Sequence, residues 1–382
     1  MRLFLFAVAV VITAAFLLVD TIDRFLNRAA EPAPVSKAVL AFHDSLWIAD
    51  FHNDALLWKR KLAVRTTRGH VDLPRLRAGG YELAVFSVPT AYHVFSNYRR
   101  TPALGDVMVF DAIASRWPAE SWFDPYRRAR VMANKLREGE RESRGGLRVV
   151  LSREDLVSLA AAQARGDSVI GALLSLEGMH LAGRDVAHVD SLFAAGFRVF
   201  GIAHMSDNDV GGSAHGWRKG GLSEFGRRVV ARIDSLGGII DLAHASRATI
   251  DDVLAMTSRP VVVSHTGLTS NCPGPRNLPD EVVTRVASRD GMIAIGFWKA
   301  AVCGNDAEAI ARAIRRAIEV AGVDHVALGS DFDGAVRTPF DAAHIASLTS
   351  ALLDAGLTRA QIRAVMGENQ KRFLLAALPS AH

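Results

Sequence analysis

Two short apolar runs, GIIDLAH at residues 238–244 and PVVVSH at residues 260–265, decide how this chain folds. Both runs are apolar at successive positions, which is typical of a parallel strand that is buried on both faces. The stretch before the first run, GLSEFGRRVVARIDSLGG, has the pattern of an amphipathic helix, with Ser223 as its N-cap and Gly237 as its stop. This order of helix and buried strand predicts an α/β protein.

The same alternation continues over the chain from about residue 40. The expected strands cover residues 46–51, 83–88, 172–176, 198–203, 238–242, 260–264, 292–297 and 326–329. Eight strands with helical crossovers predict a (β/α)8 TIM barrel. A doubly wound open sheet is the alternative, but no GxGxxG motif follows the first strand. The long connection over residues 90–170 must hold extra helices, and we interpret its Arg-rich part at 126–144 as a solvated helix face.

The composition is that of a folded globular protein. Of the 382 residues, 49% are hydrophobic and 22% are charged, which excludes a disordered chain. The net charge of +5 comes from 45 basic and 40 acidic residues, and this excess is too small to indicate a nucleic-acid partner.

The N-terminus is much more apolar than the rest of the chain. Residues 3–19 carry no charge, and a membrane-spanning helix needs at least about 17 such residues. This predicts a signal anchor or transmembrane helix over residues 1–28, a Pro-rich linker over 29–40 and one barrel domain over 41–382. A cleaved secretory signal peptide is the alternative for the first segment.

Polar side chains follow the expected strands, at the end of a barrel where active sites lie. These residues are His52, Asp54, Glu177, His204, His244, His265, Asp331 and Asp333. Nitrogen and carboxylate ligands without thiolate suit zinc or a similar divalent metal. The spacing therefore predicts one metal on His52, Asp54 and Glu177, and a second on Glu177, His244 and His265. Any one of these histidines alone is better explained as an ordinary rim residue, and only the set favours a metal site.

Two metals about 3.5–4 Å apart can share a hydroxide and polarise a carbonyl, which is the chemistry of amide hydrolysis. Beyond this, segments spread from residue 46 to 373 resemble the membrane dipeptidase (renal dipeptidase) family of binuclear zinc peptidases, in the family's own order. They are DFHND, HVDLPRLRAGG, LLSLEGMH, GIAHMSDND, GLSEFGRRVVARIDSLGGIIDLAHAS, PVVVSHTGL, RNLPD, GSDFDG and GLTRAQIRAVMGENQKRF. The resemblance implies a zinc-dependent dipeptidase with two Zn²⁺ per chain that acts through a metal-bridging hydroxide, and a homodimer.

The resemblance also implies individual roles. The family's five zinc ligands match the five metal residues named above. Its catalytic aspartate matches Asp331, its transition-state histidine matches His204, which also binds substrate, and its carboxylate-binding arginine matches Arg276. An ordinary loop arginine remains the alternative for Arg276, and we interpret Asp333 as a residue that fixes its loop rather than as a catalyst.

Two details of the loops bear on the resemblance. The family's disulfide matches Cys272 and Cys303, although two separate thiols remain an alternative. The run GFWKAAVCG at 296–304 lacks the tyrosine that the family often carries near the substrate. We therefore assign the role of this tyrosine to no residue, and the resemblance does not define the substrate preference.

The expected partners are a dipeptide substrate and a membrane, reached through the N-terminal helix, with the catalytic domain outside the cytoplasm. Another metal-dependent amidohydrolase, acting on an N-acyl amino acid, a lactone or a cyclic amide, is the second interpretation. A non-catalytic, membrane-tethered barrel that binds peptides is the third.

Overall fold

The structure is a computed structural model and describes residues 19–180 and 185–381. Within these residues nine parallel strands form one sheet, in the order β1-β2-β4-β5-β6-β7-β8-β9 with β3 beside β4. The strands are β1 (Ile48–Asn53), β2 (Tyr81–Pro89), β3 (Leu147–Val149), β4 (Ile170–Glu177), β5 (Phe197–Gly201), β6 (Ile239–Asp241), β7 (Val262–Thr266), β8 (Met292–Ile295) and β9 (Val326–Leu328). All eight predicted strands are confirmed, with small shifts at their ends.

The sheet curves into a nearly closed barrel, as predicted. Its first strand meets the segment that follows its last strand through a parallel bridge between Asn53 and Phe332. Beside it, the Asp54 amide donates to the Phe332 carbonyl at 2.8 Å, and the Asp331 amide donates to the His52 carbonyl at 3.1 Å. The barrel therefore closes through the same residues that the sequence assigns to the site.

The strand β3 was not predicted. It pairs with the beginning of β4, and β5 pairs with the later part of β4. A run of three residues is too short to give a recognisable alternation, so only the pairing reveals it.

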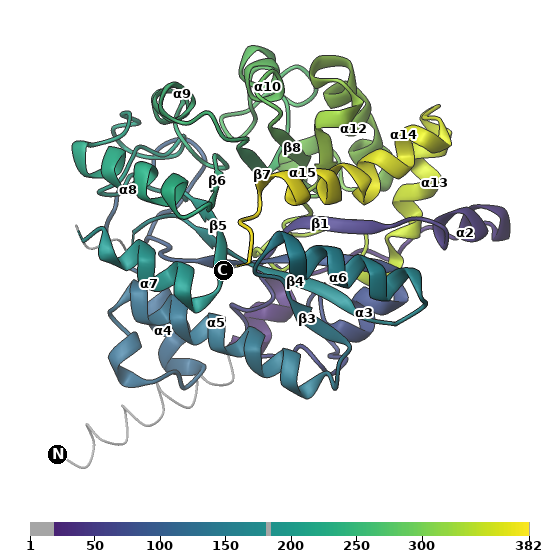
Figure 1. The fold of residues 1–382 in the computed structure, drawn as a ribbon, viewed down its shortest axis with the longest axis horizontal. Helices are drawn as coiled ribbons and strands as arrows, with labels where there is room; N and C mark the ends of the chain where they lie inside the picture. The colour runs from purple at the N-terminus through teal and green to yellow at the C-terminus, as the bar shows by residue number, and fades with distance from the viewer. Residues whose placement is uncertain (1–18, 181–184, 382) are drawn as a thin grey trace.

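Helices surround the strands in the ring that Figure 1 shows. They are α2 (Lys37–His43), α3 (Leu73–Ala78), α4 (Met108–Ala114), α5 (Pro125–Glu142), α6 (Arg153–Ala164), α7 (Ala187–Ala195), α8 (Glu224–Ser235), α9 (Arg247–Met256), α10 (Asp280–Ala287), α11 (Lys299–Val302), α12 (Ala307–Ala321), α13 (Ala346–Asp354), α14 (Arg359–Arg363) and α15 (Asn369–Ala377). The Ser223 hydroxyl accepts from the Gly226 amide at the start of α8, as its N-cap role predicts.

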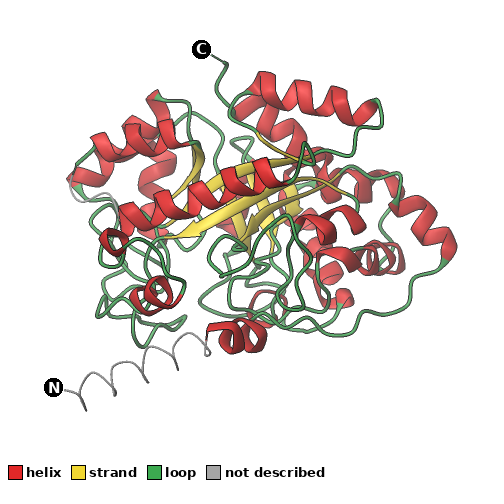
Figure 2. Cartoon of the chain, turned by 90° about the horizontal axis from the view of Figure 1, so that it is seen from below, coloured by secondary structure: helices red, strands yellow, loops and turns green. Residues whose placement is uncertain are grey.

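The barrel interior is a separate apolar core. It consists of inward residues of the strands, such as Phe51, Val85 and Val199, packed against α15 residues such as Phe373. This packing fills one end of the barrel. Figure 2 shows long loops gathered at the other end, away from the C-terminus, which leaves that end open for a site.

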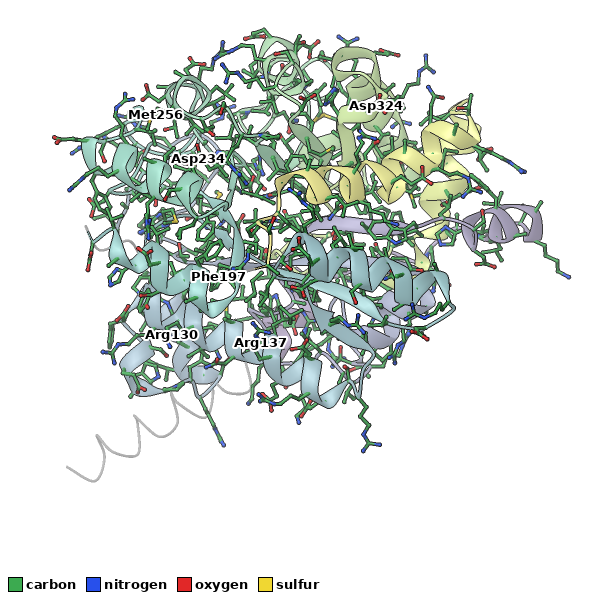
Figure 3. All side chains as sticks on the ribbon, in the orientation of Figure 1. Arg130, Arg137, Phe197, Asp234, Met256 and Asp324 are labelled. Carbon is green, nitrogen blue, oxygen red and sulfur yellow. A yellow bond between two sulfur atoms is a disulfide. The ribbon has the colours of Figure 1, made fainter. Side chains whose placement is uncertain are left out.

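The connection between β2 and β4 holds α4, α5 and α6, as expected. Its Arg-rich helix α5 is only partly a solvated face. Arg130 and Arg137 lie along α5 in Figure 3, and Arg130 is exposed. Arg128, however, is fully buried, pairs with Asp106 and donates to the Thr90 carbonyl at 3.2 Å. The interpretation of a solvated face was therefore wrong for Arg128, which ties the insertion to the end of β2.

Cys272 and Cys303 form a disulfide, so the pairing implied by the family resemblance is confirmed. It joins the loop after β7 to the end of α11 and closes a segment with a sequence separation of 31. A crosslink over a segment of this length stabilises a protein by about 3–4 kcal/mol.

At the N-terminus, residues 19–26 are helical. The predicted membrane span at 3–19 lies outside the described residues, apart from Val19. None of the helices in the described part of the chain is long and apolar enough to cross a bilayer.

We expect Asp50→Ala to lower the free energy of unfolding by about 2–3 kcal/mol, since burying a polar group without its partner costs this much. Asp50 is buried and accepts from the Ser330 amide at 2.8 Å and from the Ser330 hydroxyl at 2.6 Å, which joins β1 to the segment after β9. Urea denaturation measures the loss. The exposed Asp354 serves as a control, and Asp354→Ala should change stability by less than about 0.5 kcal/mol.

Candidate active site

A cavity of about 740 Å³ opens at the C-terminal ends of the strands. Its polar lining includes most of the predicted site residues, namely Asp54, Glu177, His204, His244, Arg276 and Asp331. His52 and His265 are buried beside them. The strand-end pattern therefore converges on one place, as the barrel topology requires.

Glu177, the last residue of β4, is the centre of the cluster. Its Oε1 atom lies 3.1 Å from His244 Nε2, 3.4 Å from His265 Nε2 and 3.7 Å from His52 Nε2. Asp54 Oδ2 lies 3.7 Å from His52 Nε2. The structure thus brings the five predicted ligands together around one carboxylate.

The structure brings donor atoms together in three groups, which share His52 and Glu177, whereas the two predicted ligand sets share Glu177 alone. His52, Asp54 and Glu177 form one group whose donor atoms lie within 4.8 Å of one another, as predicted. Two further groups are Glu177 with His204 and His244, and His52 with His265 and Asp331. His204 and Asp331 therefore lie close enough to the ligands to act on anything bound there.

Ser264 orients two of the histidines, a role that the sequence reasoning missed. Its hydroxyl lies 3.2 Å from His52 Nδ1 and 3.0 Å from His265 Nδ1. In the tautomers that carry the proton on Nδ1, this oxygen accepts from both rings and both Nε2 lone pairs face the cluster. Such partners fix the orientation of metal-binding histidines.

The loop after β9 brings Asp331 close to the cluster by means of an unusual backbone. Asp331 has a φ of 59°, in the left-handed region that few residues other than glycine adopt. A Cβ on Gly334 would lie 2.1 Å from Asp331 Oδ1 and 2.9 Å from Asp54 Oδ2, so only glycine fits there. Asp333 accepts from the amides of His70 at 2.7 Å and Val71 at 3.0 Å, in keeping with its interpretation as a loop-fixing residue.

Burial and mutual charge shift the ionisation of the cluster. Burial raises the pKa values of Glu177 and Asp331. It lowers the pKa values of His244 and His265, and the positive charge of Arg276 lowers them further, which favours neutral imidazoles with free lone pairs. Burial also lowers the pKa of His52, but Glu177 and Asp54 outweigh this effect and raise it to about 10.

These features fit a metal. His52 Nε2 and Asp54 Oδ1 are buried and have no hydrogen-bond partner. His244 Nε2 and His265 Nε2 face each other at 2.9 Å, an arrangement that a shared cation satisfies better than a single proton. Buried carboxylates next to neutral imidazoles form the donor set of a divalent metal site.

Arg276 lies in the same cavity and is buried. Its Nη2 atom donates to the His265 carbonyl at 2.7 Å, and its guanidinium lies 5.3 Å from the Trp298 ring. Its Nε atom has no partner, and no described carboxylate lies within ion-pair distance of it. A buried guanidinium without a carboxylate partner is well suited to bind one from a ligand.

Tyr92 and Tyr98 also line the cavity, and both were missed. They come from the loop after β2 rather than from the loop after β8, where the family tyrosine was sought. Burial raises the pKa of Tyr98 to about 12, so its phenol stays protonated and can donate. The aromatic residues of this loop were visible in the sequence, but nothing local showed that the loop folds over the barrel.

The family pattern described as membrane dipeptidase (peptidase family M19) matches residues 37–378. The chain belongs to the membrane dipeptidase family. The recognition made from the strand-end motifs is therefore confirmed.

A curated protein and several solved structures are similar to this chain in sequence or in fold. The dipeptidase aclJ of Aspergillus oryzae is 33% identical over 215 residues, which are 54% of this chain and 51% of that relative. The match thus spans about half the length of the relative.

Two solved structures have the same fold. A metallopeptidase from Rhodobacter sphaeroides, solved with a phosphinate mimic of the dipeptide L-Ala-D-Ala, is 24% identical with a TM-score of 0.73, covering 87% of this chain and 99% of that one. The probable dipeptidase PvdM from Pseudomonas aeruginosa is 17% identical with a TM-score of 0.75, covering 90% and 98%. At such identities the two structures establish the shared fold.

We expect Glu177→Gln to lose metal, because every predicted ligand set includes this carboxylate. The metal content of the folded protein should fall to nearly none. His180→Gln is the matched control, since this nearby half-buried histidine contacts the Thr90 and Ser206 hydroxyls at 3.1 and 3.0 Å instead of the cluster. Unchanged metal content in Glu177→Gln would contradict the central role of Glu177.

Proposed function

We propose that the protein is a zinc-dependent dipeptidase that hydrolyses the peptide bond of dipeptides. The observation that carries this proposal is the meeting of Glu177 with three imidazoles at the open end of the barrel, in a chain of the membrane dipeptidase family. His52, Asp54 and Glu177 would hold one ion, and Glu177, His244 and His265 would hold the other. When bound, such a pair polarises a carbonyl and lowers the pKa of water.

Arg276 would bind the free carboxylate of the substrate. Its buried fork supplies charge-assisted hydrogen bonds that suit a terminal carboxylate at this position. This contact would confine cleavage to the last peptide bond of a substrate, because only there does a free carboxylate lie one residue after the bond.

Asp331 and His204 would carry the proton and stabilise the charge. Asp331 Oδ1 lies 4.0 Å from His52 Nε2, and burial raises the pKa of Asp331, so it can hold a proton and pass it to the leaving amine. His204 Nδ1 contacts the Ala91 carbonyl at 3.0 Å, which directs its Nε2 atom toward Glu177 at 3.6 Å. From there it can donate to the oxyanion that forms on the substrate.

We further propose that the N-terminus anchors the enzyme in a membrane, with the barrel outside the cytoplasm. A structural disulfide is typical of an oxidising compartment. Helix 19–26, which directly follows the predicted span, pairs with the barrel through Asp23 and Arg60 at 3.1 Å, and signal cleavage at any position beyond this helix would remove it from the folded domain. This favours the anchor over the cleaved signal. A homodimer remains a prediction from the family resemblance.

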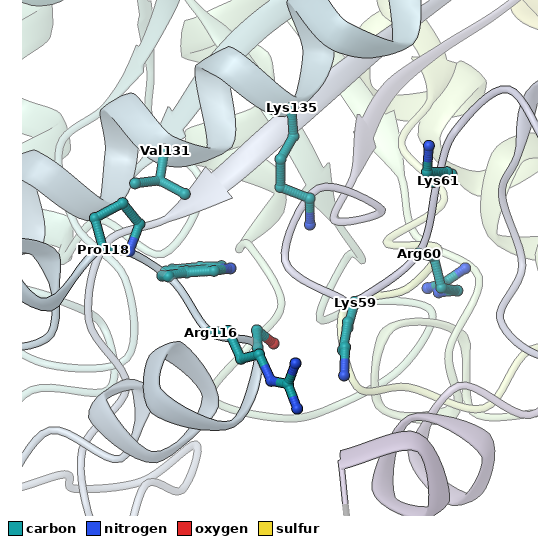
Figure 4. A pocket seen from close by; sticks show the side chains of 9 residues that line it. Lys59, Arg60, Lys61, Arg116, Pro118, Val131 and Lys135 are labelled. Atoms are coloured by element: carbon teal, nitrogen blue, oxygen red, sulfur yellow. The ribbon is translucent and has the colours of Figure 1, made fainter. Parts of the chain in front are cut away.

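A basic hollow near this helix supports contact with a membrane surface. It has a volume of about 340 Å³ and is lined by Lys59, Arg116 and Lys135 among others (Figure 4). Arg68 donates to the Lys59 carbonyl at 3.2 Å and pairs with Asp20 at 2.6 Å, so the hollow adjoins the helix. Basic residues next to an anchor favour contact with anionic lipid headgroups.

We expect Asp331→Asn to keep its metal and to lose catalysis, because the amide cannot carry the proton. The turnover number for a dipeptide should fall by about 10²–10⁴. Metal content measured on the same sample separates a lost proton carrier from a lost metal site. Unchanged turnover would remove Asp331 from the mechanism.

We expect a dipeptide to be cleaved faster than the same dipeptide with an amidated C-terminus. The charged hydrogen bonds of Arg276 contribute about 1.5–3 kcal/mol, so kcat/KM should fall about 10- to 150-fold on amidation. Arg276→Met should abolish this difference by slowing cleavage of the free acid alone. Equal rates for acid and amide in the unmodified enzyme would favour one of the other amidohydrolase activities.

A further inference from the structure

The active-site cavity has an apolar wall that no predicted site residue belongs to. Val19, Ile22 and Leu26 of helix 19–26 line it, next to Phe110 of α4 and Val336 after β9. The family match begins only at residue 37. The helix therefore lies outside the family pattern, yet it borders the same cavity as Glu177 and Asp331.

The helix is fixed to the loop that carries Asp331. Asp23 is buried and pairs with Arg60 at 3.1 Å and with Arg68 at 2.8 Å. Arg60 in turn pairs with Asp333 at 2.9 Å. The Asn27 side chain accepts from the Ala335 amide at 2.9 Å, so backbone and side chains both hold the helix in place.

The wall and Arg276 come from different segments around the cavity. The wall residues belong to helix 19–26, to α4 in the connection after β2 and to the segment after β9, whereas Arg276 follows β7. In the strand order, β2 lies four strands from β7 and β9 lies two strands from it. If Arg276 holds the C-terminal carboxylate, the N-terminal residue of a dipeptide extends toward the wall.

The size and chemistry of the cavity exceed the needs of two small residues. Its volume of about 740 Å³ is in the range that buries drug-sized ligands, which are much larger than a dipeptide of two alanines. Ile22 is 42% exposed and Phe110 is 71% exposed although both line the cavity. Exposed apolar side chains that are grouped at a groove are a feature of ligand-binding sites.

We propose that the cavity selects dipeptides with a bulky apolar N-terminal residue, and that helix 19–26 determines this specificity. The inference rests on the proposed dipeptidase function and adds the substrate class. Burial of each further methylene against the wall raises kcat/KM roughly fourfold, so Phe-Ala and Leu-Ala are favoured over Ala-Ala.

The test measures kcat/KM of the full chain in detergent for Ala-Ala, Leu-Ala and Phe-Ala, and for the reversed dipeptides Ala-Leu and Ala-Phe. For the unmodified enzyme we expect the ratio of Phe-Ala to Ala-Ala to exceed about ten. Ile22→Ser should reduce this ratio about tenfold, since it removes apolar contact from the wall. The ratio of Ala-Phe to Ala-Ala should not depend on Ile22.

Phe25→Ser is the matched control. Phe25 lies on the same helix and is 61% exposed, but it does not line the cavity. The Phe25→Ser variant should therefore have the same ratio of Phe-Ala to Ala-Ala cleavage as the unmodified enzyme. Equal melting temperatures of the two variants show that both fold. A Phe-Ala to Ala-Ala ratio near one in the unmodified enzyme would overturn the inference, and so would equal effects of Ile22→Ser and Phe25→Ser. Hydrolysis of Ala-Ala in that case would still support the dipeptidase proposal. Failure of the metal-loaded enzyme to cleave any dipeptide would overturn both.

Discussion

Three carboxylates, those of Asp54, Glu177 and Asp331, lie buried within one small volume, and the rest of the site is arranged around this electrostatic constraint. Like charges in a poorly solvated place repel strongly, and burial raises the pKa values of Glu177 and Asp331. Arg276 brings one positive charge to the cavity. The neutral imidazoles of His244 and His265 point their lone pairs inward, so they add donors without adding charge. A doubly charged ion, or two, is the counterpart that such a set requires.

The same constraint explains why the site is located at the closure of the barrel. The His52 carbonyl and the Asp54 amide bond to the segment after β9, which also carries Asp331. Misplacement of this seam would move two of the three carboxylates. The donor geometry and the closure of the sheet therefore depend on each other, which couples the stability of the fold to the formation of the site.

The sequence was sufficient for the barrel and for the polar residues at its open end, because buried strands and strand-end residues leave a local pattern. It was not sufficient where a contact joins distant segments. The short strand β3 exists only through its pairing with β4. The sequence pattern around Arg128 is that of an exposed helix face, and only the fold places Asp106 beside its buried side chain. Tyr98 and helix 19–26 reach the cavity because their segments fold over the barrel. Hydrophobic periodicity along the sequence does not reveal such long-range packing.

The ion pairs that run from Asp23 through Arg60 to Asp333 have a consequence for how this enzyme can be prepared. A soluble form that begins at residue 37 would retain every predicted metal ligand and the whole family match. It would also lack one side of its cavity and leave Arg60 with one carboxylate fewer. Such a truncated protein would be a different catalyst, with a wider entrance and a looser loop around Asp331. By the same reasoning, exchange of the leading segment among relatives offers a way to retune selectivity without touching the catalytic centre.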